Sequence, residues 1–162
     1  MGNDRLEALG RQVGQFADSG LAMGVKALLA PVAFGVTGFV LDEKSHVGLV
    51  RHSYRNGWSL PGGGVARAEP PVHAILRELR EELGTVESDP PELFGLYTRP
   101  YGWATNVIAL YRLTNARVTF RPNLEVRELI FVDPAAPPAG TTMGTRRRLA
   151  ELVNRTPPTP FW

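Results

Sequence analysis

The sequence contains no cysteine. This absence excludes disulfide bonds and thiol catalysis and favours a reducing compartment, so we expect a cytoplasmic protein. The first residues lack a basic segment followed by an unbroken apolar run, and we therefore expect no secretory signal. The most apolar stretch, residues 20–40, is interrupted by Lys26 and Pro31, which argues against a membrane span.

A marked excess of one charge is also missing. Lys plus Arg number 18 and Asp plus Glu number 16, which leaves a formal net charge of +2. So small a balance gives no argument for nucleic acid or a membrane surface as a partner. The three histidines, His46, His52 and His73, lack the spacing of a metal-binding set. The length of 162 residues predicts one domain, and no internal repeat is visible.

The most informative stretch is residues 62–86, where a run of three glycines leads into a predicted helix. Pro70 and Pro71 suit the first helical positions, which need no backbone N–H. Gly84 suits the position just past the helix end. At about 100° per residue, one apolar stripe should face the core. The residues of that stripe are Val72, Leu76, Leu79 and Leu83.

The same helix carries Glu78, Glu81 and Glu82 on a separate face. Glu78 and Glu82 are like charges four residues apart, and anions in the last turn oppose the helix dipole. One interpretation is a solvated face in which Arg77 pairs with Glu81. The other is a site for a divalent cation, since magnesium and calcium require oxygen ligands and a cation would offset both penalties.

These residues resemble the signature of the Nudix hydrolases, G-x5-E-x7-R-E-U-x-E-E-x-G-U, in which U is aliphatic. Its fixed positions are matched by Gly63, Glu69, Arg77, Glu78, Leu79, Glu81, Glu82 and Gly84. The last position holds Thr85, a departure that concerns packing rather than chemistry. The loop is not a Walker phosphate loop, because no Gly-Lys-Ser/Thr follows the glycines.

The resemblance implies a Mg²⁺ or Mn²⁺ site and an ion pair between Glu69 and Arg77 that fixes the loop against the helix. The implied metal ligands are the Gly63 carbonyl, Glu78 and Glu82, with Glu81 as a ligand or as a neighbour of one. Water would attack a diphosphate, and a carboxylate would take its proton. Glu81, Glu82 and Glu125 are the candidates for this base, and the sequence does not choose among them.

The rest of the chain predicts an α/β protein, and the resemblance implies the Nudix-type α/β/α sandwich with a mixed sheet. Strands are expected at residues 33–41, 46–52, 93–98, 106–113, 116–120 and 128–132, the first two as a hairpin. A helix is expected at residues 142–154, with its arginine run, residues 146–148, in solvent.

The predicted domain covers residues 31–155, followed by a Pro-rich tail over residues 156–162. Residues 1–30 predict an N-terminal helical extension, with apolar residues at helical spacing and several glycines that weaken it. We expect it to pack outside the main fold or against a second subunit in a homodimer. A frayed terminal arm is the alternative.

Four residues outside the signature are candidates for substrate binding. Arg51 and Arg55 are suited to bidentate contact with phosphate, although each could be a solvated surface arginine. Tyr101 and Trp103 belong to an aromatic loop that could stack a base or cap the end of the sheet. Glu125, in a polar loop, could bind a further metal ion, with Glu128 as competitor and a plain surface glutamate as the alternative.

The predicted function is Mg²⁺-dependent hydrolysis of a nucleoside diphosphate linked to another group. The resemblance leaves open a nucleoside triphosphate, ADP-ribose, a nucleotide sugar or a dinucleoside polyphosphate as the substrate. The alternative is a catalytically silent nucleotide-binding or scaffold module, although no glutamate or arginine of the signature is lost. RNA-end processing would require a basic groove, which the near-neutral charge does not support.

Overall fold

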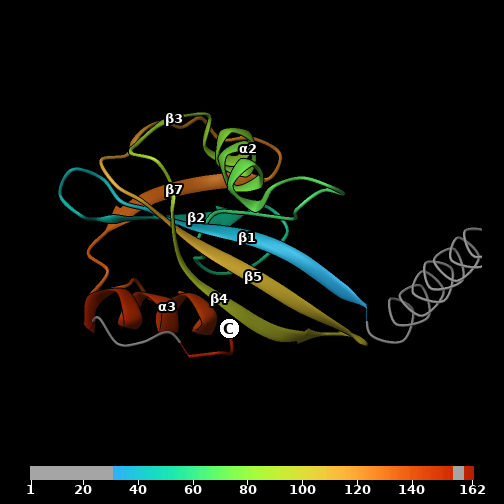
Figure 1. Ribbon diagram of the computed structural model, residues 1–162. Helices are drawn as coiled ribbons and strands as arrows, with labels where there is room; N and C mark the ends of the chain where they lie inside the picture. Colours follow the sequence, from blue (N-terminus) through green and yellow to red (C-terminus); the bar gives the residue numbers. More distant parts are fainter. Residues whose placement is uncertain (1–30, 155–158) are drawn as a thin grey trace, which may run out of the picture.

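The computed structural model describes residues 31–154 and 159–162. Their elements, in chain order, are β1 (Val32–Val40), β2 (Val47–His52), α2 (Pro71–Leu83), β3 (Thr85–Glu87), β4 (Glu92–Tyr101), β5 (Ala104–Leu113), β6 (Arg117–Thr119), β7 (Val126–Val132) and α3 (Met143–Asn154) (Figure 1). Every predicted strand and both helices predicted in this part of the chain are present. The short strand β3 was not predicted.

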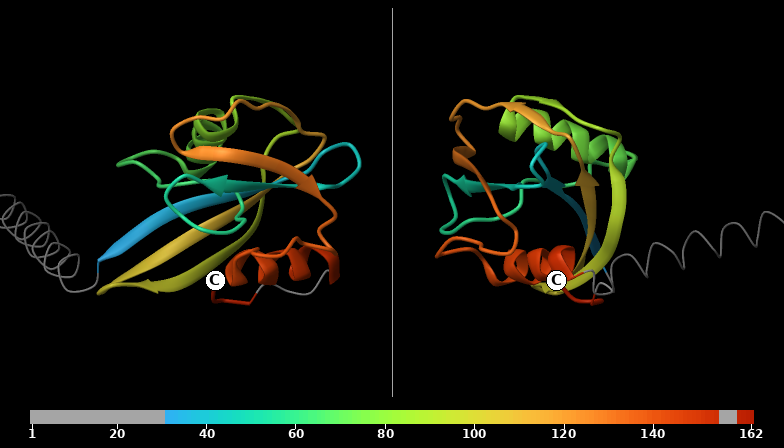
Figure 2. Two further views of the ribbon diagram at one scale, coloured as in Figure 1. Left: turned by 180° about the vertical axis from the view of Figure 1, so that it is seen from behind. Right: turned by 90° about the vertical axis from the view of Figure 1, so that its left-hand side faces the viewer.

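The strands form a mixed arrangement between two helices. β1 pairs parallel with β5, and β5 pairs antiparallel with β4. β2 pairs antiparallel with β7, and β3 with β6. α2 and α3 lie on opposite sides of the strands in Figure 1 and in both views of Figure 2. The predicted α/β/α sandwich is therefore confirmed.

Each helix covers its own hydrophobic core. Beneath α2, Ile75 and Leu79 pack with Val36 and Val40 of β1. On the α3 side, Leu149 packs in the cluster that contains Phe39 of the same strand. A strand segment buried on both faces needs apolar residues at successive positions. This explains the mostly apolar second half of β1, residues 36–40, whereas its first three residues are exposed.

The predicted hairpin between the first two strands is wrong. The strands share a tight turn at residues 42–46 and one bridge, Leu41 with Val47, but each then pairs elsewhere. Residues 59–65 occupy the edges that a hairpin would have used. The Gly63 carbonyl accepts the Val36 N–H at 2.9 Å, and Ser59 exchanges backbone hydrogen bonds with Val50. The glycine loop is thus held as an extended segment beside β1.

α2 begins at the predicted prolines and ends at Leu83, after which Gly84 has a φ of +83°. Its buried side is displaced from the predicted stripe, because Ile75 is fully buried whereas Val72 and Leu76 are only partly buried. Gly38 of β1 faces this side of the helix, since a Cβ there would lie 3.3 Å from Leu113 and 3.4 Å from Ile75.

The expectation of a solvated arginine run in α3 fails for Arg148, which is fully buried. Its guanidinium donates to Glu151 at 2.8 Å and lies 4.0 Å from the ring centre of Tyr97. The Tyr97 hydroxyl donates to the same carboxylate at 2.9 Å. Pairing with Glu151 compensates the buried charge of Arg148, although its Nε has no hydrogen-bond partner among the described residues.

The predicted N-terminal extension, residues 1–30, lies outside the described residues, as do residues 156–158 of the predicted tail. The domain boundaries therefore stay predictions. Among the helices of the described part of the chain, none combines the length and the apolar character needed to cross a bilayer.

Replacing Gly62 by alanine should lower the free energy of unfolding by about 2 kcal/mol or more. Gly62 has a φ of +139°, and a Cβ there would lie 2.2 Å from the Val36 carbonyl oxygen. Gly64→Ala is the matched control, because a Cβ at that position meets nothing within 4 Å. Chemical denaturation of both variants tests this expectation, and equal stabilities would contradict it.

Candidate active site

The site is built around the guanidinium of Arg77, which joins α2 to the glycine loop. Its Nε and Nη2 donate to the two carboxylate oxygens of Glu69, both at 2.9 Å, and Nη2 also donates to the Gly64 carbonyl at 2.9 Å. The Ala66 N–H donates to Glu69 as well. The Arg77 hydrogen bonds, followed by that of Ala66, lower the pKa of Glu69 to about 2. The predicted ion pair is therefore present.

The same guanidinium contacts two further carboxylates of α2. Nη1 donates to Glu78 at 2.8 Å and to Glu81 at 3.1 Å. Burial raises the pKa of Glu78, the Arg77 hydrogen bond opposes this, and the nearby charges of Glu81 and Glu82 raise the pKa further. One cation thus faces three carboxylates, which leaves net negative charge beside the loop.

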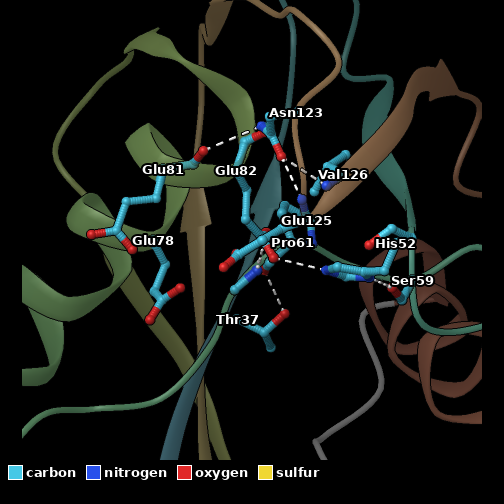
Figure 3. Close-up of polar contacts among 12 residues, drawn as sticks. Thr37, His52, Ser59, Pro61, Glu78, Glu81, Glu82, Asn123, Glu125 and Val126 are labelled. Atoms are coloured by element: carbon cyan, nitrogen blue, oxygen red, sulfur yellow. Dashed lines mark hydrogen bonds and ion pairs between the residues drawn. The ribbon is translucent and has the colours of Figure 1, made fainter.

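Glu82 points away from this group and is only 2% exposed. One carboxylate oxygen lies 2.7 Å from Nε2 of His52, and the other accepts the Gly62 N–H at 2.8 Å. On the far side of the ring, Ser59 Oγ lies 3.3 Å from Nδ1 of His52. In Figure 3 the Glu82 side chain runs toward His52 and Pro61, whereas Glu78 and Glu81 lie to the other side. The interpretation of a wholly solvated acidic face is therefore wrong for Glu82.

Glu125 is brought to the site by the loop before β7. The Asn123 amide donates to the Glu82 carbonyl at 3.0 Å, and its Oδ1 accepts the N–H of Glu125 at 2.9 Å (Figure 3). Tyr54 lies close enough to these carboxylates to be affected by their charge. Burial raises the pKa of Tyr54, the charge of Arg55 opposes this, and the charges of Glu82, Glu125 and Glu78 raise the pKa further. Glu128, the competitor, instead pairs with Arg51 at 2.9 Å on the β2–β7 ladder.

A cavity of about 690 Å³ adjoins the glycine loop. Arg55 and Tyr101 line it. Arg51 does not, since it packs over Trp58 and binds Glu128. Trp103 is outside the lining and 80% exposed. Sequence reasoning missed several lining residues, among them His52, Tyr54, Arg99, Asn106, Arg147 and Trp162.

The positions of the carboxylates indicate which of them could bind a divalent cation. Within residues 31–154 and 159–162, no three His, Asp or Glu side chains are arranged to hold an ion. The two oxygens of Glu82 are hydrogen-bonded to His52 and to the Gly62 N–H, and each oxygen keeps a further lone pair that could bind a cation. Glu78 and Glu81 each use one oxygen for Arg77. Their other oxygens are hard donors of the kind magnesium and manganese accept, so these two carboxylates fit the group.

The lowered pKa of Glu69 predicts how the free energy of unfolding depends on pH. A carboxylate with a folded pKa below its unfolded value stabilises the fold above the unfolded pKa, about 4.3, and loses that contribution as pH falls through about 2. We expect the Glu69 carboxyl signal in NMR to titrate near pH 2 in the parent and at a clearly higher pH in Arg77→Met, where only the Ala66 N–H still lowers the pKa. A titration midpoint of Glu69 at its ordinary value in the parent would contradict the Glu69–Arg77 ion pair described here.

Comparison with known proteins agrees with this geometry. The sequence model described as the NUDIX domain matches residues 31–152. The chain is 36% identical over 101 residues to an ADP-ribose pyrophosphatase of Mycobacterium tuberculosis, a match covering 59% of this chain and 48% of that protein. It is 39% identical over 64 residues to an RNA pyrophosphohydrolase of Xanthomonas campestris pv. campestris, covering 40% of this chain and 29% of that protein. These matches span about half or less of the relatives' lengths.

Comparison with solved structures also finds proteins with a similar fold. The crystal structure of a MutT NUDIX hydrolase from Burkholderia pseudomallei superimposes with a TM-score of 0.65 at 21% identity, covering 75% of this chain and 98% of that one. At this identity the likeness concerns the fold alone. The match of the family model over most of the chain and the geometry around Arg77 lead to one conclusion: the chain belongs to the Nudix hydrolase family.

Proposed function

We propose that this protein is a Mg²⁺- or Mn²⁺-dependent hydrolase of diphosphate bonds in nucleotide-type substrates. The observation that carries the proposal is the contact of Arg77 with Glu69, Glu78 and Glu81 at the mouth of the glycine loop. Family members generally use divalent metal ions, and the excess of carboxylates over cations here supplies the negative charge such an ion requires. Catalytic silence is disfavoured, because every acidic group of the signature is in place.

Glu78 and Glu81 would hold the cation, which supplies charge neutralisation at phosphate oxygens and a lowered pKa of water. Glu82 would position the loop through Gly62 and His52. Glu125 is the preferred proton acceptor, because its side chain accepts no hydrogen bond from the described residues, while Glu81 and Glu82 are engaged. A free carboxylate beside the acidic group is suited to take a proton from the attacking water.

The substrate would extend from the acidic group into the neighbouring cavity. A volume of about 690 Å³ lies within the range of sites for ligands of nucleotide size. Tyr54, Tyr101 and Trp162 provide aromatic surface that a base could contact. The names of the relatives, an ADP-ribose pyrophosphatase and RNA pyrophosphohydrolases, support a diphosphate substrate. A nucleoside triphosphate, ADP-ribose and a nucleotide sugar remain the candidates.

A substrate panel with Mg²⁺ or Mn²⁺ tests the reaction. We expect turnover of at least one nucleotide diphosphate and a loss of about 100-fold or more in kcat for Glu78→Gln and for Glu125→Gln. Glu87→Gln, an exposed glutamate on β3, is the control and should behave as the parent. Absence of turnover on the whole panel, or parental activity of Glu78→Gln, would refute the proposal.

Cation binding can be measured without substrate. Millimolar Mg²⁺ or Mn²⁺ should raise the melting temperature of the parent, because a ligand that binds only the folded state stabilises it by mass action. Relief of repulsion among Glu78, Glu81 and Glu82 adds to this effect. The double variant Glu78→Gln/Glu81→Gln should show no metal-dependent shift, and an equal shift in both proteins would place the ion elsewhere.

A further inference from the structure

The cavity beside the glycine loop is positively charged. Arginines reach it from three separate elements: Arg55 from the loop after β2, Arg99 from β4 and Arg147 from α3. Among the described residues, no aspartate or glutamate lines it. Because three guanidinium groups gather there and no Asp or Glu side chain is among the described lining residues, the cavity is suited to an anionic ligand.

Arg99 differs from the other two in what it contacts. Arg147 donates to the Trp162 carbonyl at 2.6 Å, and Arg55 packs over the ring of Tyr54. The Nε of Arg99 is buried, and in the described part of the chain it has no hydrogen-bond partner. A buried N–H of a charged group without an acceptor is destabilising. Because this atom is shielded, a ligand in the cavity would contact the terminal nitrogens of the Arg99 guanidinium, which form no hydrogen bond or ion pair with the described residues.

The neighbours of Arg99 extend this polar surface. Arg99 pairs across the strands with Asn106 of β5, which in turn pairs with Ala33 of β1. Cross-strand partners lie on one face of a sheet, and all three residues line the cavity. Ala33 is small, so the row leaves space above it. The Asn106 amide and the Arg99 fork can therefore donate to the same oxyanion.

This position is separate from the acidic group. The glycine segment is bridged to β1 through Gly64, β1 pairs with β5, and β5 pairs with β4. Three strand spacings thus separate Gly64 from the strand of Arg99, about 14 Å along the sheet. Glu78 lies against Gly63 and is not part of the cavity lining. An anion at Arg99 is therefore a different group from the phosphates beside Glu78.

We propose that Arg99, with Asn106 beside it, forms a second anion subsite for a phosphate ester that the substrate carries away from the scissile diphosphate. This inference rests on the proposed function and narrows the substrate class to diphosphates whose far moiety bears a further phosphate. Three guanidinium groups favour a dianionic phosphate over a single carboxylate. The planar fork of Arg99 matches two phosphate oxygens at once.

Paired ligands that differ by one phosphate test the subsite. We would measure affinities by calorimetry without divalent cations for NADH against NADPH and for dephospho-coenzyme A against coenzyme A. In at least one pair the phosphorylated ligand should bind the parent about tenfold or more tightly than its partner. Arg99→Gln should abolish the difference, and Arg99→Lys should retain part of it, because lysine keeps the charge and loses the fork.

Arg127→Gln is the matched control, since Arg127 is an exposed arginine on β7 outside the cavity lining. It should leave the discrimination intact. Melting temperatures of all variants exclude misfolding as the cause of a loss. Equal affinities within both pairs, or discrimination that persists in Arg99→Gln, would overturn the proposal.

A free phosphate site is distinguished by NMR of the Arg99 Nε–H. If inorganic phosphate alone shifts that signal with the affinity of the phosphorylated ligands, the subsite binds free phosphate and the assignment to substrate fails. Discrimination without hydrolysis in the substrate panel would refute only the proposed function. Hydrolysis without discrimination would refute only the subsite.

Discussion

The hydrogen bond from the Gly62 amide to the buried Glu82 carboxylate is the contact on which the site depends. The same carboxylate contacts His52, so one side chain of α2 holds both the glycine loop and the end of β2. Gly62 can make this contact because it has a positive φ and no Cβ, and a side chain there would collide with β1. The helix, the loop and two strands are thereby fixed relative to one another.

Charge is distributed unevenly around this anchor. Arg77 binds both oxygens of Glu69 and the Gly64 carbonyl, and its Nη1 is shared between Glu78 and Glu81. Glu82 is hydrogen-bonded to the Gly62 amide and to His52 instead of to Arg77. The outer carboxylates therefore keep unneutralised charge, and the rise in the pKa of Glu78 reports that Glu78 is partly buried and lies beside like charges. A folded protein retains such a group at a cost in stability, which a bound cation would remove.

The cavity has the opposite charge to the acidic group it adjoins. Its arginines come from a loop, a strand and a helix, and its aromatic side chains come from equally distant parts of the chain. Trp162 reaches the wall because residues 160–162 run beside β4, where the Thr98 N–H donates to the Pro160 carbonyl and the Trp162 N–H donates to Thr98. A negative patch beside a positive cavity suits a substrate that meets a metal ion at one end and guanidinium groups at the other.

Local sequence features were enough to predict the elements and the acidic pattern of α2. Prolines, Gly84 and the acidic residues act over a few positions, so the helix and its ends could be predicted from local spacing, whereas the Glu69–Arg77 pair followed from the resemblance to the family signature. Strand positions were also found, because side-chain composition reports local conformation.

Tertiary structure alone decided which strands pair and what surrounds each carboxylate. The hairpin prediction failed because pairing depends on which edge a distant segment occupies, here residues 59–65. His52 and Glu82 are 30 residues apart, and Arg99 and Arg147 share the cavity only through the docking of α3. Such contacts leave no periodic signal in the sequence, because they follow from the packing of elements and not from the conformation of any one of them.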